Sequence, residues 1–335
     1  MSKKSRLFLI LSIVIFILVF CVALMVGRYP IKISDFFNCL FTSDGSYETH
    51  KSIILNLRLP RTIMAACVGV GLSLSGLLFQ EIFQNKLTSP DLLGVSTGAS
   101  VGAAIAIILG LSSIYISVFA FITGVVTVII TLLISKLFRN GSSMILILSG
   151  IIVGGFMSSI LSFVKYFADP TTTLSSITYW LMGSFENSKI ENIYVMLPAI
   201  FICCIILLLL SWRINIIALG KEEAQTKGLN YQFYRILIIS IATLLTALSV
   251  AFCGTISWVG LVIPHIVRLI VGRDTRKTIP LCISFGAIFM TIVDVISRTF
   301  TDSEIPLSAV TGLLGTMIFI TILFQKRKEI SNDIN

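Results

Sequence analysis

Apolar runs of about 20 residues recur along the whole chain, and each is long enough to cross a lipid bilayer as an α-helix. The chain has 335 residues, of which 56% are hydrophobic and 12% are charged. Soluble domains carry about 25% charged residues, so this chain has too little polar surface to enclose its apolar side chains in water. A membrane β-barrel would show short alternating segments, which this sequence lacks. The sequence predicts one all-α, polytopic membrane domain over residues 1–335.

The hydropathy pattern predicts ten spans. The first follows Lys3, Lys4 and Arg6, as a signal peptide would, but its apolar stretch is too long and no small-residue cleavage site follows it. We therefore expect it to be retained as a transmembrane helix. The third and eighth spans are short. In order, the spans are Leu7–Gly27, Thr62–Phe83, Leu93–Gly110, Ile114–Leu137, Met144–Tyr166, Ile193–Trp212, Tyr234–Phe252, Ile256–Val271, Ile279–Val295 and Leu307–Phe324.

Basic residues orient the chain, because lysines and arginines accumulate on the cytoplasmic side of membrane proteins. With the N-terminus inside, 17 of the 25 basic residues fall in cytoplasmic segments. Ten spans then place both termini in the cytoplasm. The net charge of +9 is explained by this topology, and no basic stripe with interleaved aromatic residues indicates a nucleic-acid partner. The other eight basic residues are Arg28, Lys32, Lys51, Arg58, Arg61, Lys165, Lys189 and Arg298.

Side chains that hold metals or carry out covalent chemistry are few. Two histidines occur, and the seven cysteines are scattered without a Cys-x-x-Cys pair. A metal site needs several converging ligands. We therefore expect no metal site, no cofactor and no catalytic residue, and we interpret the cysteines as small apolar packing residues.

One polar segment, ALGKEEAQTKGLN at residues 218–230, interrupts the apolar pattern between the sixth and seventh predicted spans. Gly220 precedes it, Glu222 and Glu223 stand in its first turn, and Gly228 is placed to end it, which is the punctuation of a short helix. About seven residues are too few to stay helical alone in water. The segment is either a short polar connector or a docking helix for a cytoplasmic partner.

Arginines gather at the outer ends of two predicted spans. Arg58 and Arg61 flank Pro60 directly before the second span, and Arg298 stands near the end of the ninth. Single arginines there are explained as snorkelling anchors. A group of three would instead form a cationic rim that pairs with carboxylates of a soluble partner. Asp294, one turn before Arg298, is either a functional intramembrane charge or a structural partner of that arginine.

Small residues in the second span predict close helix packing. Gly69, Gly71 and Gly76 recur at spacings that let helices approach closely in lipid. Gln80 and Gln84 follow on one helical face and are candidates to line an aqueous cavity.

Prolines mark two further positions. Pro90 is followed by Asp91, which predicts the start of a helix. Pro264 predicts a kink or break in the eighth span. We interpret His265, which follows it, as a buried and hydrogen-bonded side chain in preference to a proton relay.

Several motifs resemble a known family together, in order and at family-like spacing, from about Asn56 to Phe324. The chain strongly resembles the FecCD-type permeases, the membrane subunits of bacterial ABC importers for ferric siderophores, haem and cobalamin. The motifs are LRLPR, GLSLSGLLFQ, SPDLLGVSTGAS, ALGKEEAQTKGLN, WVGLVIPHIVRLIVGRDTRK, DVISR and EIPLSAVTGLLGT.

The resemblance implies a type II ABC importer permease fold with ten transmembrane helices in the bacterial cytoplasmic membrane. It also implies three protein partners: a second permease subunit, a cytoplasmic ABC ATPase dimer and an extracytoplasmic substrate-binding protein. The chain contains no G-x-x-x-x-G-K-[ST] phosphate loop, so any ATP hydrolysis falls to a separate chain. Ferric siderophore is the expected cargo, with haem or cobalamin as alternatives.

The resemblance also assigns roles to particular residues. It places the coupling helices that seat in the ATPase at residues 218–230, with Gly220, Glu222, Glu223 and Ala224 on the motif. It matches Arg58, Arg61 and Arg298 to outer arginines that meet glutamates of the binding protein. It matches Ser142 and Ser143 to the cytoplasmic gate between the fourth and fifth spans. Lys86 departs from the family pattern, which usually has Asn-Pro-Leu there, so the geometry of that loop is open.

Two other classes of protein compete with this interpretation. An ion-coupled secondary transporter would use Asp294 and His265 to carry protons. An intramembrane enzyme would need a nucleophile, a base or metal ligands that converge, and the sequence offers none.

Overall fold

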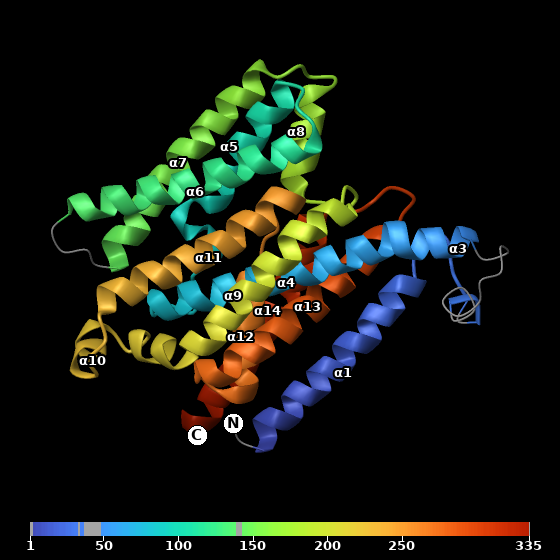
Figure 1. Ribbon diagram of the computed structural model, residues 1–335. Helices are drawn as coiled ribbons and strands as arrows, with labels where there is room; N and C mark the ends of the chain where they lie inside the picture. The colour runs from blue at the N-terminus through green and yellow to red at the C-terminus, as the bar shows by residue number, and fades with distance from the viewer. Residues whose placement is uncertain (1–2, 33, 37–47, 139–142, 335) are drawn as a thin grey trace.

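The computed structural model describes residues 3–32, 34–36, 48–138 and 143–334, apart from the side chains of 323 and 325–334, and contains no strand in these ranges. The helices expected to cross the membrane are α1 (Lys3–Met25), α4 (Leu59–Ile82), α5 (Val95–Ile108), α6 (Ser113–Leu137), α7 (Ser143–Phe167), α9 (Ile190–Ile217), α11 (Tyr231–Cys253), α12 (Val259–Val271), α13 (Thr275–Thr299) and α14 (Leu307–Ile334). The remaining helices are α3 (Glu48–Ser52), η2 (Ile53–Arg58), η3 (Pro90–Leu93), α8 (Thr173–Met182) and α10 (Lys221–Thr226). Figure 1 shows their arrangement.

Each of the ten predicted spans corresponds to one helix. Among the described residues, seven helices are long and apolar enough to cross a membrane, and three shorter apolar helices, at 95–108, 259–271 and 307–322, complete the set. The expectation that the third and eighth spans are short is confirmed by α5 and α12. The prediction of an all-α fold with ten transmembrane helices is confirmed.

The structure corrects the start of the second span. The helical segment begins at Glu48 and runs without a break to Ile82, so it is 35 residues long instead of starting at Thr62. Its first part passes through a π-helical turn, in which the Leu59 N–H donates to the carbonyl of Ile54, five residues back. Pro60 then lies in the first turn of α4, directly after this π-helical turn.

A second correction concerns α8, which was not predicted. This helix of 10 residues lies between α7 and α9 at the end of the molecule away from α10 (Figure 1). Its sequence, TLSSITYWLM, is too short and too rich in hydroxyl groups to register as a span.

Helix α4 is the centre of the fold, with α9, α11, α12 and α13 packed around it. Its glycines make this possible. A Cβ atom on Gly69 would lie 2.1 Å from the carbonyl oxygen of Gly286 on α13, and one on Gly76 would lie 1.9 Å from that of Gly260 on α12. The helices therefore touch backbone to backbone at these points, as the small-residue pattern predicted.

Hydroxyl groups bond across the same contacts. Ser73 Oγ donates to the carbonyl of Cys282 at 2.8 Å, and Ser75 Oγ lies 2.6 Å from Thr246 Oγ1. In lipid, where water supplies no alternative partner, such bonds stabilise helix contacts. The six cysteines that the structure describes are free, and most are buried in this core, in agreement with their interpretation as packing residues.

We expect the replacement of Gly76 by Ala to destabilise the fold by about 1–3 kcal/mol, because the new methyl group meets backbone that cannot rotate away. Thermal unfolding in detergent measures the effect. Gly155 on α7 is the matched control, since a Cβ there has nothing within 4 Å. Equal thermal midpoints for Gly76→Ala and Gly155→Ala would contradict the tight contact.

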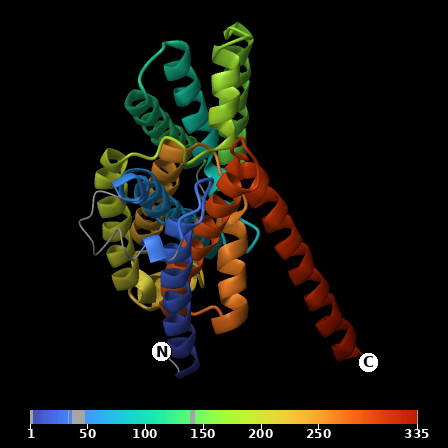
Figure 2. The same ribbon diagram turned by 90° about the vertical axis from the view of Figure 1, so that its right-hand side faces the viewer.

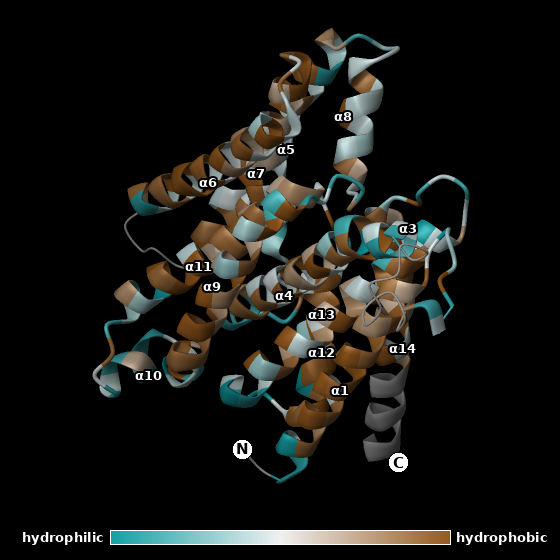
Figure 3. Cartoon of the chain, turned by 45° about the vertical axis from the view of Figure 1, so that its right-hand side comes forward, coloured by the Kyte–Doolittle hydropathy of each residue, from teal (hydrophilic) through white to brown (hydrophobic). Residues whose placement is uncertain are grey.

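Apolar side chains cover the periphery of the bundle. The apolar window of α1 is only 17% buried, and those of α6 and α7 are 28% and 22% buried. Figure 3 shows these helices as almost continuously hydrophobic along their length. An exposed apolar surface of this extent requires lipid or another apolar protein around it.

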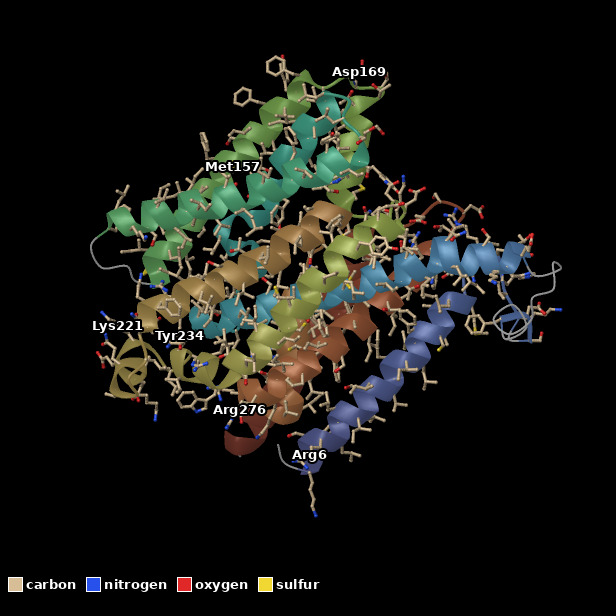
Figure 4. All side chains as sticks on the ribbon, viewed as in Figure 1. Arg6, Met157, Asp169, Lys221, Tyr234 and Arg276 are labelled. Carbon is tan, nitrogen blue, oxygen red and sulfur yellow. The ribbon has the colours of Figure 1, made fainter. Side chains whose placement is uncertain are left out.

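Basic side chains mark one end of the molecule. The N-terminal end of α1, the C-terminal end of α14 and the α10 turn lie at the same end in two perpendicular views, with α8 at the opposite end (Figures 1 and 2). Arg6, Lys221 and Arg276 lie at the α10 end, whereas Asp169 lies at the other (Figure 4). These labelled side chains lie at the ends that the expected topology gives them, and the orientation of the chain in the membrane stays a prediction.

Candidate functional site

The polar segment forms a separate small helix, α10, between α9 and α11. Gly220 precedes it with φ +114°, a backbone conformation open to glycine, and Gly228 follows it with φ +74°. The Thr226 hydroxyl donates to the Glu223 carbonyl at 2.9 Å, and Asn230 Oδ1 accepts from the Phe233 N–H at 3.1 Å to begin α11. The predicted punctuation of this helix is therefore confirmed.

One side of α10 packs on the chain itself and the other faces outward. Ala224 has no exposed surface and belongs to the main hydrophobic core. Glu222, Glu223, Gln225 and Lys227 are exposed. This burial corrects one part of the expectation from the sequence: Ala224 anchors the helix from inside and offers no surface of its own to a partner. The short helix is held in place by this contact and not by a partner alone.

A cavity of about 650 Å³ opens beside α10, at the ends of α4, α9 and α12. Gln80 and Gln84 both line it, as expected, but they do not share a helical face, because Gln84 lies beyond the end of α4 in a turn with φ +51°. Gln84 Nε2 donates to the Ala218 carbonyl at 3.1 Å and so ties the end of α4 to the segment before α10. The lining residues are Gln80, Glu81, Gln84, Lys86, Trp212, Asn215, Ile216, Ala218, Leu219, Arg268, Arg273, Asp274 and Arg276.

Buried polar contacts fix the walls of this cavity. Gln80 Oε1 accepts from both terminal nitrogens of Arg268, at 2.7 Å from Nη1, and its amide donates to the Gly260 carbonyl at 3.1 Å. Arg268 Nε lies 3.5 Å from Glu81 Oε1. The sequence analysis singled out Gln80, but its pairing with Arg268 joins residues 188 positions apart and has no signal in the sequence.

Asp274 caps α13 at the same end. Its carboxylate accepts from Arg276 Nε at 3.0 Å and from Asn215 Nδ2 at 2.9 Å. These bonds, with that to Arg276 first, hold the pKa of Asp274 below its usual value of 3.8. Because the folded-state pKa is lowered, this contribution to stability is complete at neutral pH and is lost only as the pH falls through that lowered pKa.

The three outer arginines come together at the end opposite α10. Arg58 donates from Nη1 to the carbonyls of Leu24 and Met25, at 3.0 and 2.7 Å, and from Nη2 to the carbonyl of Tyr29. It therefore closes the open C-terminal end of α1, where helix carbonyls lack partners. Only 5% of Arg58 is exposed.

Arg61 and Arg298 share one buried carboxylate. Asp294, with no exposed surface, lies 2.6 Å from Arg61 Nε and 3.4 Å from Arg298 Nε. The remaining nitrogens of Arg61 pair with both oxygens of Glu304, with Nη2 at 3.0 Å from Oε2. Arg298 Nη2 donates to the Ala23 carbonyl at 2.5 Å. The pair of Asp294 and Arg298 is thus part of a four-residue network that joins α4, α13 and the segment before α14.

These contacts correct the expectation of an exposed cationic rim. Arg61 and Arg298 are 9% and 6% exposed, and both are neutralised from within the chain. A small cavity of about 240 Å³ nevertheless reaches them from the surface, and Arg28 stands exposed at its edge. The sequence analysis counted Arg28 only among the outer basic residues, because its proximity to Arg58 depends on how α1 ends.

The resemblance matched Ser142 and Ser143 to a cytoplasmic gate, and the structure describes one of these two residues. Ser142 lies outside the described residues, and Ser143 is the half-buried first residue of α7. Among the residues that the structure describes, no group of three or more His, Cys, Asp or Glu side chains is placed to hold a metal ion. His265 is 8% exposed and lies edge-on to Phe319, with ring centroids 5.7 Å apart.

A family model described as the FecCD transport family matches residues 15–325 of the chain. The solved structure described as an inward-facing conformation of a metal-chelate type ABC transporter superimposes with a TM-score of 0.87 and 34% sequence identity. The match covers 95% of this chain and 98% of that chain.

Curated relatives carry names for different cargoes. "Molybdate import system permease protein MolB" of Haemophilus influenzae is 34% identical over 93% of this chain and 94% of its own length. "Probable iron chelatin transport system permease protein" of Helicobacter pylori is 36% identical, over 82% and 83%. "Vitamin B12 import system permease protein BtuC" of Citrobacter koseri is 33% identical, over 82% and 84%. The fold, the family model and these relatives agree that this chain belongs to the FecCD transport family of ABC importer permeases.

Proposed function

We propose that this chain imports a ferric siderophore by alternating access, as one of two permease subunits that work with a separate ABC ATPase dimer and an extracytoplasmic substrate-binding protein. The basic end that carries α10 lies in the cytoplasm, with both termini, and the end that carries Arg28, Arg58, Arg61 and Arg298 faces outward. The observation that carries the proposal is α10 itself: a helix anchored from inside through Ala224, with its acidic first turn exposed.

The surroundings of α10 support an ATPase partner on that face. Lys86, Arg273 and Arg276 lie along the neighbouring cavity with Glu81 and Asp274, so the surface beside the helix carries both signs of charge. Charged groups at a rim fix the register of a partner more than they add affinity. The bond from Gln84 to Ala218 joins this surface to the central helix α4, which gives a partner's motion a rigid path into the bundle.

Arg28 offers the clean test of the outer face. We expect Arg28→Glu to lower stimulation of ATP hydrolysis by the substrate-binding protein about tenfold, since like charge opposes the partner's carboxylates. Assembly with the ATPase should be unchanged, because Arg28 is exposed and lies at the other end of the molecule. Arg58 and Arg61 are unsuited to this test, since they hold buried contacts. Lys189→Glu, also exposed on an outer loop, is the control; equal stimulation in both variants would contradict docking at Arg28.

The cargo is tested by uptake into proteoliposomes that contain the permease, its ATPase and its binding protein. The Helicobacter pylori relative supports an iron chelate. The Haemophilus influenzae and Citrobacter koseri relatives make molybdate and vitamin B12 the competing candidates. ATP-dependent uptake of a radiolabelled ferric siderophore, unaffected by excess molybdate or cobalamin, is the expected result. Uptake of molybdate or cobalamin in its place would show that the proposed cargo is wrong and that the proposed importer function is right.

A secondary transporter would use ionisable groups that exchange protons with water. Asp294 is instead enclosed between Arg61 and Arg298 and has no exposed surface, so it is separated from water. We expect no uptake in proteoliposomes that hold a proton gradient and no ATPase. Uptake under that condition would favour the secondary transporter.

A further inference from the structure

The segment between α13 and α14, with the first residue of α14, is bonded to three other elements at the outer end: α13, α8 and α4. The Ile305 N–H donates to the Ser297 carbonyl at 3.0 Å, which ties the segment to α13. The Leu307 N–H donates to the Gly183 carbonyl at 3.1 Å, at the end of α8. Glu304, directly before Ile305, pairs with Arg61 of α4 through both carboxylate oxygens. Residues 300–306 are therefore a junction, and we call this segment the outer junction.

The end of α8 is itself packed on α11. The Ser184 N–H donates to the Cys253 carbonyl at 2.9 Å, and a Cβ on Gly254 would lie 3.0 Å from the Cα of Gly183. A displacement of the outer junction thus reaches both α14, which it begins, and α8, through the bond between Leu307 and Gly183.

The two carboxylates that pair with Arg61 differ in their exposure to the outside. Asp294 has no exposed surface and serves two arginines, so an outside carboxylate cannot reach or replace it. The side chain of Glu304 is 14% exposed and lines the small outer cavity together with Arg28, Arg58 and Arg61. An incoming carboxylate that enters this cavity meets Glu304 first, in the position where it would itself pair with Arg61.

We propose that Glu304 competes with the docking partner for Arg61. A carboxylate of the partner displaces Glu304 from Arg61, and docking thereby releases the outer junction and the end of α8. The inference rests on the proposed docking at the outer arginines and adds what docking changes within this chain. The Nη1 and Nη2 edge of Arg61 donates to one carboxylate in bidentate geometry at a time, so the pairings with Glu304 and with an incoming carboxylate exclude each other. The bond between Glu304 and Arg61 then sets both the affinity for the partner and the stability of the outer junction.

The test compares Glu304→Gln with Asp302→Asn in the full transporter, reconstituted in nanodiscs. Asp302 is exposed, two residues away on the same segment, and its replacement removes the same charge. In the absence of the binding protein, the hydrogen-exchange rate of peptides that cover 300–307 and 183–188 should be at least about threefold higher in Glu304→Gln than in the unmodified transporter. The same peptides should exchange at an unchanged rate in Asp302→Asn. The binding protein should then bind Glu304→Gln about fivefold to tenfold more tightly, because no internal carboxylate has to be displaced.

The outcomes separate this inference from the proposed docking. Faster exchange with unchanged or weaker binding would overturn the competition. Unchanged exchange would overturn the release of the outer junction, whatever the binding result. If the binding protein fails to bind the unmodified transporter at all, the docking proposal and the competition fall together, while the exchange result still tests the junction. Size-exclusion chromatography of each variant shows that it is folded before it is compared.

Discussion

Asp294→Asn is expected to be the most damaging single substitution in this chain. The carboxylate has no exposed surface and lies within 2.6 Å of Arg61 and 3.4 Å of Arg298. Asparagine keeps the shape but leaves two buried guanidinium groups without their shared charge, and its amide adds a donor where donors already converge. Removal of one partner from a buried ion pair costs about 3–5 kcal/mol. Thermal unfolding in detergent should show a midpoint lowered on the order of 5–10 °C.

Two further variants make this prediction specific. Asp302→Asn, which removes an exposed carboxylate nearby, should leave the midpoint within a degree or so, because exposed charges contribute about 0–1 kcal/mol. Replacement of Arg298 by Met in the Asp294→Asn background should recover part of the loss, since one uncompensated buried charge is removed. An unchanged midpoint in Asp294→Asn, or no recovery in the double variant, would show that the network contributes little.

Reversal of both acidic residues of α10 is expected to abolish assembly with the ATPase. The change from Glu222 and Glu223 to lysine alters the charge of this exposed face by four units, while Ala224 continues to anchor the helix from inside. Like charges placed across an interface cost several kcal/mol. We expect co-purification of the ATPase to fall at least tenfold, which corresponds to about 1.4 kcal/mol or more. Uptake should be lost with it.

Controls separate charge from structure at α10. Glu191→Lys reverses an exposed charge at the first turn of α9, at the outer end, and should leave assembly intact. The Glu222→Gln and Glu223→Gln double variant removes charge without adding repulsion, so a smaller loss there identifies attraction between opposite charges. Full assembly and uptake of the charge-reversed chain would refute docking at α10.

The spans and α10 were predictable from the sequence for physical reasons that act locally. A run of about 20 apolar residues predicts a transmembrane helix whatever other helices pack against it. Glycines on both sides of Lys221–Thr226 predict the short helix between them. The second span was predicted to begin only at Thr62, whereas the helical segment begins at Glu48. A π-helical turn over Ile53–Arg58 continues the helix up to Pro60, and nothing in the local pattern indicates such a turn.

The network around Arg61 shows the opposite case. The arginines were visible in the sequence, and so was the spacing of Asp294 from Arg298. Their burial was not visible, because it depends on Glu304, 243 residues away, and on carbonyl groups at the end of α1. Local spacing identifies which charges exist at an end of a span. Only the packing of the helices decides whether those charges face one another or a partner.

The glycine contacts of α4 bear on how the transporter can move. Gly69 and Gly76 are seven residues, or about 10 Å, apart along the helix, and each presses bare backbone against a different neighbour, Gly286 of α13 and Gly260 of α12. At these contacts no side chain can change rotamer to accommodate a sliding or twisting of α4 against α12 or α13. Helices α4, α12 and α13 must therefore travel as one rigid block. Opening and closing of the pathway then falls to elements outside that block, so a spectroscopic ruler placed between α4 and α13 should read a constant length through the whole transport cycle.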